Sequence, residues 1–272
     1  RNIDPDYVVV TDMALPEKSI EFLKKFGKVI IFDHHLQDKH DVFYHHNPVI
    51  DGQSPKKYPS ASWVVNDYLD KEHDFLSILG AFGDREDKLK ENDYAMETVE
   101  KVIKDLDSTF DDILECAYRL DTLYKMGKRD EITNMPFKLS DFIHPDDVLN
   151  LKDLEKNQDI LDKAIQDEIN SDLEELKDGV YLREMESSYN IISTVTRRLA
   201  WSRDEDIVMV VNCEYIQDSC QIYIRGPIPN SENIIEKMKK EGYSAGGKSD
   251  VVGMVIPSSD KEEVLNKILK ML

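Results

Sequence analysis

The chain has 272 residues, of which 40% are hydrophobic and 33% charged, and its formal net charge is −20. This length is enough for two ordinary domains, and the composition is that of a soluble globular protein. No apolar run approaches the ~20 residues that span a bilayer, and no signal-peptide pattern is present, so we expect no membrane partner. The negative charge argues against nonspecific adhesion to nucleic acid over the whole surface, but it is compatible with a local basic groove or a metal site.

The three cysteines, Cys116, Cys213 and Cys220, are too few and too scattered for a disulfide framework or a zinc site. We therefore expect a reducing, cytoplasmic environment. The chain opens on Arg1 rather than Met and enters an apolar stretch within a few residues, so we also expect further sequence on its N-terminal side.

The first third of the sequence alternates strands and helices. Residues 7–10 form a short apolar strand, a helix follows and ends at Gly27, and residues 28–32 form the next strand. A helix over 60–69 and a second apolar segment over 75–82 come next. Strands separated by helices predict parallel pairing.

From about residue 92 the sequence becomes acidic, leucine-rich and helical, with a long amphipathic helix over 151–176. A second α/β pattern begins near Gly179. Its expected elements are a strand over 180–185, a helix over 190–201, adjacent strands over 207–211 and 220–224, a helix over 231–240, a glycine-rich loop over 242–248, a strand over 251–256 and a helix opened by Ser259.

This pattern predicts an α/β protein with two α/β domains. The first is a parallel-sheet domain over 1–105, and the smaller second domain covers 179–272. A helical connector over 106–178 joins them.

The densest group of chemically active side chains is Asp33-His34-His35, at the end of the strand over 28–32. Ligands collect at the carboxyl ends of strands in open α/β sheets. Asp12 follows the first strand and Asp84 follows the apolar segment over 75–82, so both occupy similar positions. Carboxylates with imidazole suit Mn²⁺ or Mg²⁺ better than structural zinc. Asp12 or Asp84 taken alone is equally readable as a loop or capping residue, but the set favours a metal site.

The glycine-rich segment at Gly246-Gly247-Lys248 is a second candidate site. Exposed backbone N–H groups and the Lys248 ammonium would bind an anion such as phosphate. Arg225, at the end of a predicted strand, would serve the same pocket. A plain turn and a solvated strand end are the alternative interpretations of these two features.

The remaining histidines are weaker candidates. His45-His46 precedes Asn47-Pro48 without an acidic neighbour, and His40, His73 and His144 are isolated in sequence. We expect these last three to be ordinary surface residues.

With these motifs in place, the sequence resembles the DHH phosphoesterase superfamily, whose signature is matched by Asp33-His34-His35. Val9-Val10-Thr11-Asp12 is similar to the second family motif, and Asn47-Pro48 belongs with the third. Residues 79–84 resemble the fourth, an apolar strand end that closes on an Asp. Arg225 and residues 246–253 resemble the DHH-associated C-terminal domain.

The resemblance implies two domains with a cleft between them, and two Mn²⁺ or Mg²⁺ ions. Asp12, His34 and Asp84 would be metal ligands. Asp33 would be a ligand or would orient His34, and His35 would lie where the metal meets the substrate phosphate. This assigns Asp33, His34 and His35 as the catalytic group. His35, Arg225, Gly246, Gly247 and Lys248 would bind the substrate phosphate or backbone.

Two departures from the family pattern are visible. The first family motif, an Asp-x-Asp, is absent, which either truncation or true loss explains. Lys248 stands where the family usually has His, and Lys is a weaker candidate for specific hydrogen bonding or proton transfer.

Three functions follow as hypotheses. The acidic helical middle and Gly83-Asp84-Arg85 look most like archaeal RecJ-like proteins, which implies a two-metal exonuclease on single-stranded DNA or RNA, in DNA replication or repair. The missing motif favours instead a weak or inactive replication scaffold that binds a GINS subunit. The third hypothesis is a phosphatase for oligonucleotides, pyrophosphate or another small molecule.

Overall fold

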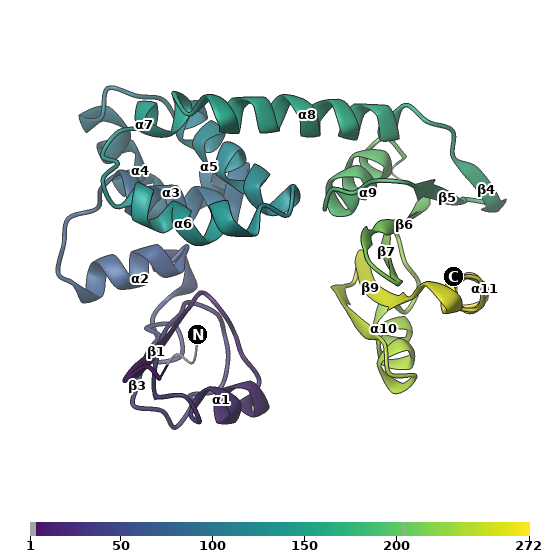
Figure 1. Ribbon diagram of the computed structural model, residues 1–272, viewed down its shortest axis with the longest axis horizontal. Coiled ribbons are helices and arrows are strands. Elements are labelled where there is room, and N and C mark those ends of the chain that lie inside the picture. The colour runs from purple at the N-terminus through teal and green to yellow at the C-terminus, as the bar shows by residue number, and fades with distance from the viewer. Residues whose placement is uncertain (1–3, 204) are drawn as a thin grey trace. The chain divides into compact units, whose positions relative to one another are not determined.

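The computed structural model describes residues 4–203 and 205–272 (Figure 1). The chain folds into two compact units. Unit 1 comprises Arg1–Asp121 and Thr133–Leu154, and unit 2 comprises Thr122–Ile132 and Glu155–Leu272. The helical segment predicted as a separate connector, 106–178, is divided between these units, because its amphipathic helices bury their apolar faces within one unit or the other.

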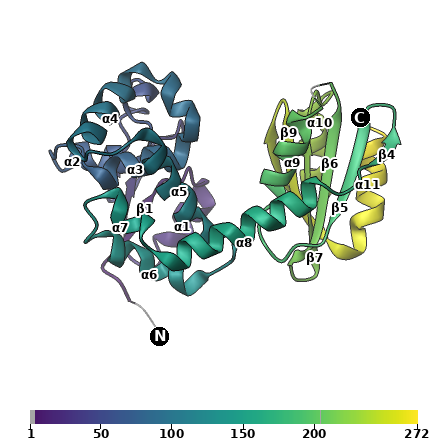
Figure 2. The same cartoon turned by 90° about the horizontal axis from the view of Figure 1, so that it is seen from above.

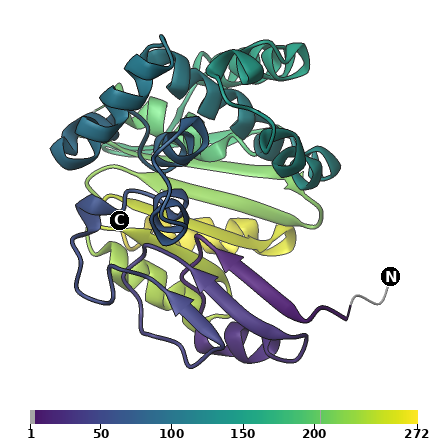
Figure 3. The same ribbon diagram turned by 90° about the vertical axis from the view of Figure 1, so that its left-hand side faces the viewer.

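Unit 1 contains a parallel sheet in the order β1-β2-β3, formed by β1 (Tyr7–Thr11), β2 (Lys28–Phe32) and β3 (Tyr44–His46). Helix α1 (Glu17–Leu23) lies against one face of these strands (Figure 3). Ile20 of α1 packs there with Val10, Val29 and Ile31. The predicted parallel pairing is therefore confirmed.

Helices make up the rest of unit 1. They are α2 (Ala61–Tyr68), α3 (Phe75–Arg85), α4 (Asp93–Asp105), α7 (Pro145–Leu149) and the unit 1 portions of α5 (Phe110–Lys125), α6 (Arg129–Leu139) and α8 (Lys152–Ile169), with short 3₁₀ turns η1 (Pro55–Lys57) and η2 (Glu86–Glu91). No helix in the described part of the chain is long and apolar enough to cross a bilayer.

The segment before Asp84 is a helix, not the strand end that the family resemblance implied. Asp74 caps α3, because its side chain accepts a hydrogen bond from the Ser77 backbone N–H at 2.9 Å. Phe75, Ile78, Leu79 and Phe82 are buried at the spacing of one helical face. Asp84 therefore lies in the last turn of α3.

Unit 2 contains a mixed sheet in the order β4-β5-β6-β7-β9-β8. Its strands are β4 (Glu174–Lys177), β5 (Val180–Met185), β6 (Ile207–Ile216), β7 (Ser219–Arg225), β8 (Ser244–Lys248) and β9 (Val251–Pro257). Its helices after α8 are α9 (Ile192–Trp201), α10 (Ser231–Lys240) and α11 (Lys261–Leu269), the last preceded by the 3₁₀ turn η3 (Ser258–Asp260).

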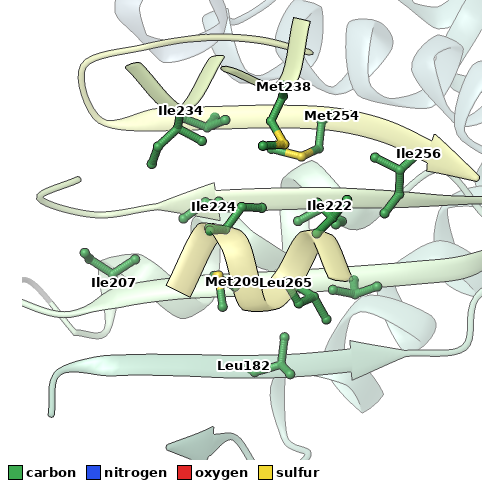
Figure 4. Packing of buried hydrophobic residues seen from close by; sticks show 14 of the residues in the cluster. Leu182, Ile207, Met209, Ile222, Ile224, Ile234, Met238, Met254, Ile256 and Leu265 are labelled. Atoms are coloured by element: carbon green, nitrogen blue, oxygen red, sulfur yellow. The ribbon is translucent and has the colours of Figure 1, made fainter. Parts of the chain in front are cut away.

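The two faces of this sheet bury different residues because side chains alternate along each strand. Met209 and Ile222 pack with α10 and α11 on one face (Figure 4). Val208 and Val210 pack against α9 on the other face, so α9 and α11 lie on opposite sides of the sheet (Figure 2).

Three sequence predictions for unit 2 were wrong in detail. The segment predicted as a glycine-rich loop forms edge strand β8, because its backbone pairs with β9 and Gly246 lies opposite Gly253. The long helix α8 ends at Ile169, and β4 follows because 174–177 pair with β5. The last helix begins at Lys261 with Asp260 as its N-cap, not Ser259.

Cys213 and Cys220 form a disulfide, whereas the spacing of the cysteines predicted no disulfide framework. Strands β6 and β7 form an antiparallel hairpin that brings these two cysteines together, with their Cα atoms 4.0 Å apart. The cysteine content therefore does not support a reducing compartment. Cys116 is a buried free thiol in α5.

Candidate metal centre

Three of the predicted site residues meet within unit 1. The Nε2 atom of His34 lies 3.1 Å from Oδ1 of Asp12 and 3.3 Å from Oδ2 of Asp84. Asp12 follows β1, His34 follows β2 and Asp84 ends α3, so three separate elements supply one ligand each. The predicted metal-ligand set is therefore brought together in the fold.

The backbone at the end of β1 sets the position of Asp12. This residue has a left-handed conformation, with φ at 60°, and its N–H donates to the carbonyl oxygen of Phe32 at 3.1 Å. Asp is one of the few side chains that adopt this conformation readily. The turn ends the pairing with β2 and directs the chain away beside His34.

The hydrogen bond on the other side of the His34 ring determines what its Nε2 atom can do. Nδ1 lies 3.0 Å from the carbonyl oxygen of Tyr58, and a carbonyl only accepts, so Nδ1 carries the proton. In the neutral ring, Nε2 then has a lone pair that faces two carboxylates. In this neutral state the buried Nε2 has no proton to donate and makes no hydrogen bond among the described residues. A divalent cation would satisfy all three groups at once, so the residues fit a metal ion.

The pKa shifts in the cluster reflect the same crowding of charge. When Nε2 of His34 carries a proton, its hydrogen bond to Asp12 lowers the pKa of that carboxyl. Burial, followed by repulsion from Asp12, raises the pKa of Asp84. For His34, burial acts to lower the pKa, but the hydrogen bonds with Asp12 and the Tyr58 carbonyl outweigh it, and the net pKa is raised. Without a cation, a proton on His34 therefore reduces the repulsion between the carboxylates of Asp12 and Asp84.

Asp33 is completely buried and orients His35, whereas the family resemblance implied a ligand or a contact with His34. Nδ1 of His35 lies 2.8 Å from Oδ1 of Asp33, and the Gln37 side-chain amide donates to Oδ2. The Asn47 side chain donates to the backbone carbonyl of His35 at 2.8 Å. These bonds fix the ring and leave Nε2 of the half-exposed His35 available.

Asp33 and His35 are nevertheless close to the metal-ligand set. One candidate ligand atom from each of Asp12, Asp33, His34 and His35 lies within 4.8 Å of the others. A cavity of about 440 Å³ borders Asp12 and Asp84 and extends over α2 and α3. The metal-ligand set therefore lies at the end of an open cavity.

The predicted phosphate-binding residues lie in unit 2. A second cavity, of about 410 Å³, is lined by Gly246 and Gly247 of β8 together with Tyr223 and Gly253. Lys248 is exposed at the end of β8, and the Arg225 guanidinium lies 3.4 Å from Oδ2 of Asp250. Gly246 of β8 lies opposite Gly253 of β9, so neither strand carries a side chain at this part of the cavity wall.

The isolated histidines have structural contacts that were not evident from the sequence. His144 is the N-cap of α7, and its Nε2 lies 2.8 Å from the carbonyl oxygen of Leu106. His40 lies 2.8 Å from Glu17 and stacks on His45, and His73 lies against Trp63. The His40 side chain is only 7% exposed, which contradicts its predicted surface position, whereas the His144 side chain is 36% exposed.

Comparison with known proteins identifies the fold of the chain through solved structures alone. No family model and no curated protein matches the chain. A solved structure of RecJ from Thermus thermophilus in complex with Mn²⁺ is similar at a TM-score of 0.64 and 14% identity, over 97% of this chain and 44% of that one. Another exonuclease RecJ, bound to manganese, gives a TM-score of 0.65 at 13% identity, over 97% of this chain and 74% of that one.

The DHH domain of a protein assigned to a ribosomal-protein family gives a TM-score of 0.56 at 15% identity, over 93% of this chain and 66% of that one. The chain has the DHH phosphoesterase fold. It spans less than half of the length of the Thermus RecJ. The fold predicted from Asp33-His34-His35 is thus confirmed, and two of these DHH-fold structures hold manganese.

Proposed function

We propose that this DHH-fold chain is a metal-dependent phosphoesterase that hydrolyses phosphodiesters of single-stranded DNA, RNA or short oligonucleotides. The observation that carries the proposal is the position of His34, whose Nε2 faces the carboxylates of both Asp12 and Asp84. This arrangement suits Mn²⁺ or Mg²⁺, and solved RecJ structures of the same fold contain these two ions.

Asp12, His34 and Asp84 would hold the ion in this proposal. The bound ion would polarise a phosphoryl oxygen and lower the pKa of a coordinated water. Of the two ions expected from the sequence, these three residues account for one. A second ion would need further ligands, and Asp33 could supply one only beside the hydrogen bonds that its two oxygens already accept.

His35 would act on the substrate beside the metal. Nδ1 of His35 is held by Asp33, so Nε2 is the atom that would face the substrate, and in the doubly protonated ring it would donate a hydrogen bond to a phosphate oxygen or a proton to the leaving group. His35 would therefore stabilise the negative charge that develops during phosphoryl transfer.

Unit 2 would bind the rest of the substrate backbone. Gly246 has open space where a side chain would stand, so a phosphate can approach its backbone closely. Lys248 and Arg225 would supply positive charge to this surface in a protein whose net charge is −20. The roles of Gly246, Gly247, Lys248 and Arg225 in binding phosphate are part of the proposal.

The second candidate, a replication scaffold that binds a GINS subunit, is favoured by a separate observation. Phe137 of α6 and Ile143, in the turn before α7, are 75% and 78% exposed, although both side chains are strongly apolar. Exposed apolar groups on adjacent segments are typical of protein interaction sites. A small-molecule phosphatase, the third candidate, would use the same metal-ligand set on a smaller substrate.

Cleavage of end-labelled single-stranded DNA and RNA separates these candidates. The wild-type chain, Asp84→Asn and the matched control Asp87→Asn are assayed with Mn²⁺ and with EDTA. The proposal predicts Mn²⁺-dependent shortening by the wild type and Asp87→Asn and none by Asp84→Asn. No cleavage by the folded wild type, together with stable capture of a GINS subunit, would favour the scaffold. Release of phosphate from pyrophosphate without cleavage of oligonucleotides would favour the small-molecule phosphatase.

A further inference from the structure

Four rings gather at the β3 edge of the unit 1 sheet. Tyr68 of α2 lies with its ring centroid 5.0 Å from Phe32, 5.6 Å from Tyr44 and 5.2 Å from His46. The rings of Tyr44 and His46 are nearly parallel, at 9°, with centroids 6.1 Å apart. We call Phe32, Tyr44, His46 and Tyr68 the aromatic platform.

The aromatic platform is accessible. Tyr68 is 48% exposed and Tyr44 36%, and Phe32 and His46 are half-buried between them. Strand β3 pairs only with β2 among the described residues, so one side of the aromatic platform is a sheet edge. A contiguous group of exposed aromatic rings is unusual on a monomer surface and marks a binding site more often than a lone exposed ring does.

The aromatic platform lies next to the metal centre within the same unit. Phe32 pairs with His46 in the sheet register, and the backbone N–H of Asp33 donates to the His46 carbonyl oxygen at 3.2 Å. Phe32 is two residues from His34, a separation of at most about 7 Å along an extended backbone. A ring bound on the aromatic platform would therefore be adjacent to a phosphate bound at the metal.

The charges around the aromatic platform indicate a neutral ligand group. Burial lowers the pKa of His46, so its imidazole is neutral at pH 7. The neighbouring charges that act most on His46 are the carboxylates of Asp67 and Asp51, which would repel a phosphate. In the described part of the chain, none of the cation–ring contacts involves these four rings.

We propose that the aromatic platform stacks an unpaired nucleobase of the nucleotide next to the phosphate held at the metal centre. This inference rests on the proposed function and identifies where the base of a single-stranded substrate binds. Every nucleobase has a π-face, so the aromatic platform would select single strands over duplexes without strong sequence preference. The aromatic platform carries no charge, as a nucleobase does not, whereas the metal centre would carry the positive charge that a phosphate needs.

Fluorescence polarisation with two labelled probes of equal length tests this inference. One probe is oligo-dT and the other is the corresponding abasic strand, both measured at low salt with Ca²⁺ in place of Mn²⁺, so that a cation can occupy the metal centre while Mn²⁺-dependent cleavage is absent. Tyr44→Ala and Tyr68→Ala are compared with Tyr44→Phe and with Tyr94→Ala, a control tyrosine of unit 1 that is 54% exposed.

The two platform alanine variants should each lose about tenfold in affinity for oligo-dT, whereas Tyr44→Phe and Tyr94→Ala should retain it. Affinity for the abasic probe should be the same in all variants. Unchanged oligo-dT binding in Tyr44→Ala and Tyr68→Ala, equal losses on both probes, or no oligo-dT binding by the wild type would overturn the inference. Mn²⁺-dependent cleavage by the wild type is scored separately, so the proposed function can survive a failure of the stacking site.

Discussion

One imidazole, that of His34, joins the end of β1 to the segment before α2. Its Nε2 lies 3.1 Å from Oδ1 of Asp12, and its Nδ1 lies 3.0 Å from the carbonyl oxygen of Tyr58. The carbonyl fixes the tautomer, so the atom that faces Asp12 is the one that can bind a metal. An ordinary surface loop has no need to fix the tautomer of a histidine ring in this way.

Asp84→Asn should separate stability from metal binding. In the metal-free protein, burial and the repulsion from Asp12 raise the Asp84 pKa, so the neutral amide should leave the melting temperature unchanged or raise it. Mn²⁺ at 100 times its Kd should stabilise the wild type by about 2.7 kcal/mol and the variant much less. Thermal unfolding with and without Mn²⁺ measures both effects. Equal stabilisation of wild type and variant by Mn²⁺ would contradict the ligand role of Asp84.

Mn²⁺ affinity should fall as the pH is lowered. The pKa of His34 is raised above 6.5, and Nε2 must lose its proton before it binds a metal. Below the His34 pKa, each pH unit should therefore weaken binding by about tenfold, whereas at higher pH the affinity should level off. Calorimetric titration of Mn²⁺ between pH 5 and 8.5 measures the profile. A flat profile would show that His34 does not bind the ion.

Asp33→Asn should impair turnover more than metal binding. An amide at this position lacks the negative charge that the buried carboxylate places beside Nδ1 of His35, so it should orient the ring less firmly. We expect the hydrolysis rate to fall by about 10–100-fold while Mn²⁺ affinity is largely retained. Asp38→Asn, which changes an exposed carboxylate in the same loop, is the control and should retain both the rate and the Mn²⁺ affinity. A parallel loss of Mn²⁺ affinity and rate in Asp33→Asn would instead assign Asp33 to the metal.

The two neighbouring glycines of β8 should respond differently to alanine. A Cβ atom on Gly247 would lie 2.0 Å from the carbonyl oxygen of Val251, whereas one on Gly246 would meet nothing within 4 Å. Gly247→Ala should therefore destabilise the protein by about 1–3 kcal/mol, and Gly246→Ala should change stability by less than about 0.5 kcal/mol.

Urea unfolding measures this difference, and oligonucleotide binding by Gly246→Ala then tests the phosphate role. In that stable variant, a methyl group on the binding surface should weaken binding. If Gly246→Ala binds as well as the wild type does, the phosphate would not lie on Gly246.

The sequence allowed the parallel sheet and the three residues of the proposed metal-ligand set, Asp12, His34 and Asp84, to be predicted. Apolar runs that end in Asp12 and Asp33 indicated parallel strands, and carboxyl ends of such strands share an edge. Asp84 was predicted as a ligand, but its helix was missed, because a short, mostly apolar run such as 75–82 fits a buried strand as well as a helix.

Features that depend on distant partners were beyond sequence reasoning. The pairing of Cys213 with Cys220 follows from a hairpin register, and the capping role of His144 follows from the position of α7. The exposure of Tyr44 and Tyr68 depends on which strand forms the sheet edge. Local sequence patterns do not specify these relationships.

The most direct test of the metal centre is calorimetric titration of Mn²⁺ into the wild-type chain and His34→Ala at pH 8, with His73→Ala as the control histidine. We expect saturable binding to the wild type and His73→Ala, and an affinity at least about 100-fold weaker in a folded His34→Ala. Equal Mn²⁺ binding by the wild type and His34→Ala would contradict the proposed centre, because the ion would then bind without the imidazole that faces Asp12 and Asp84.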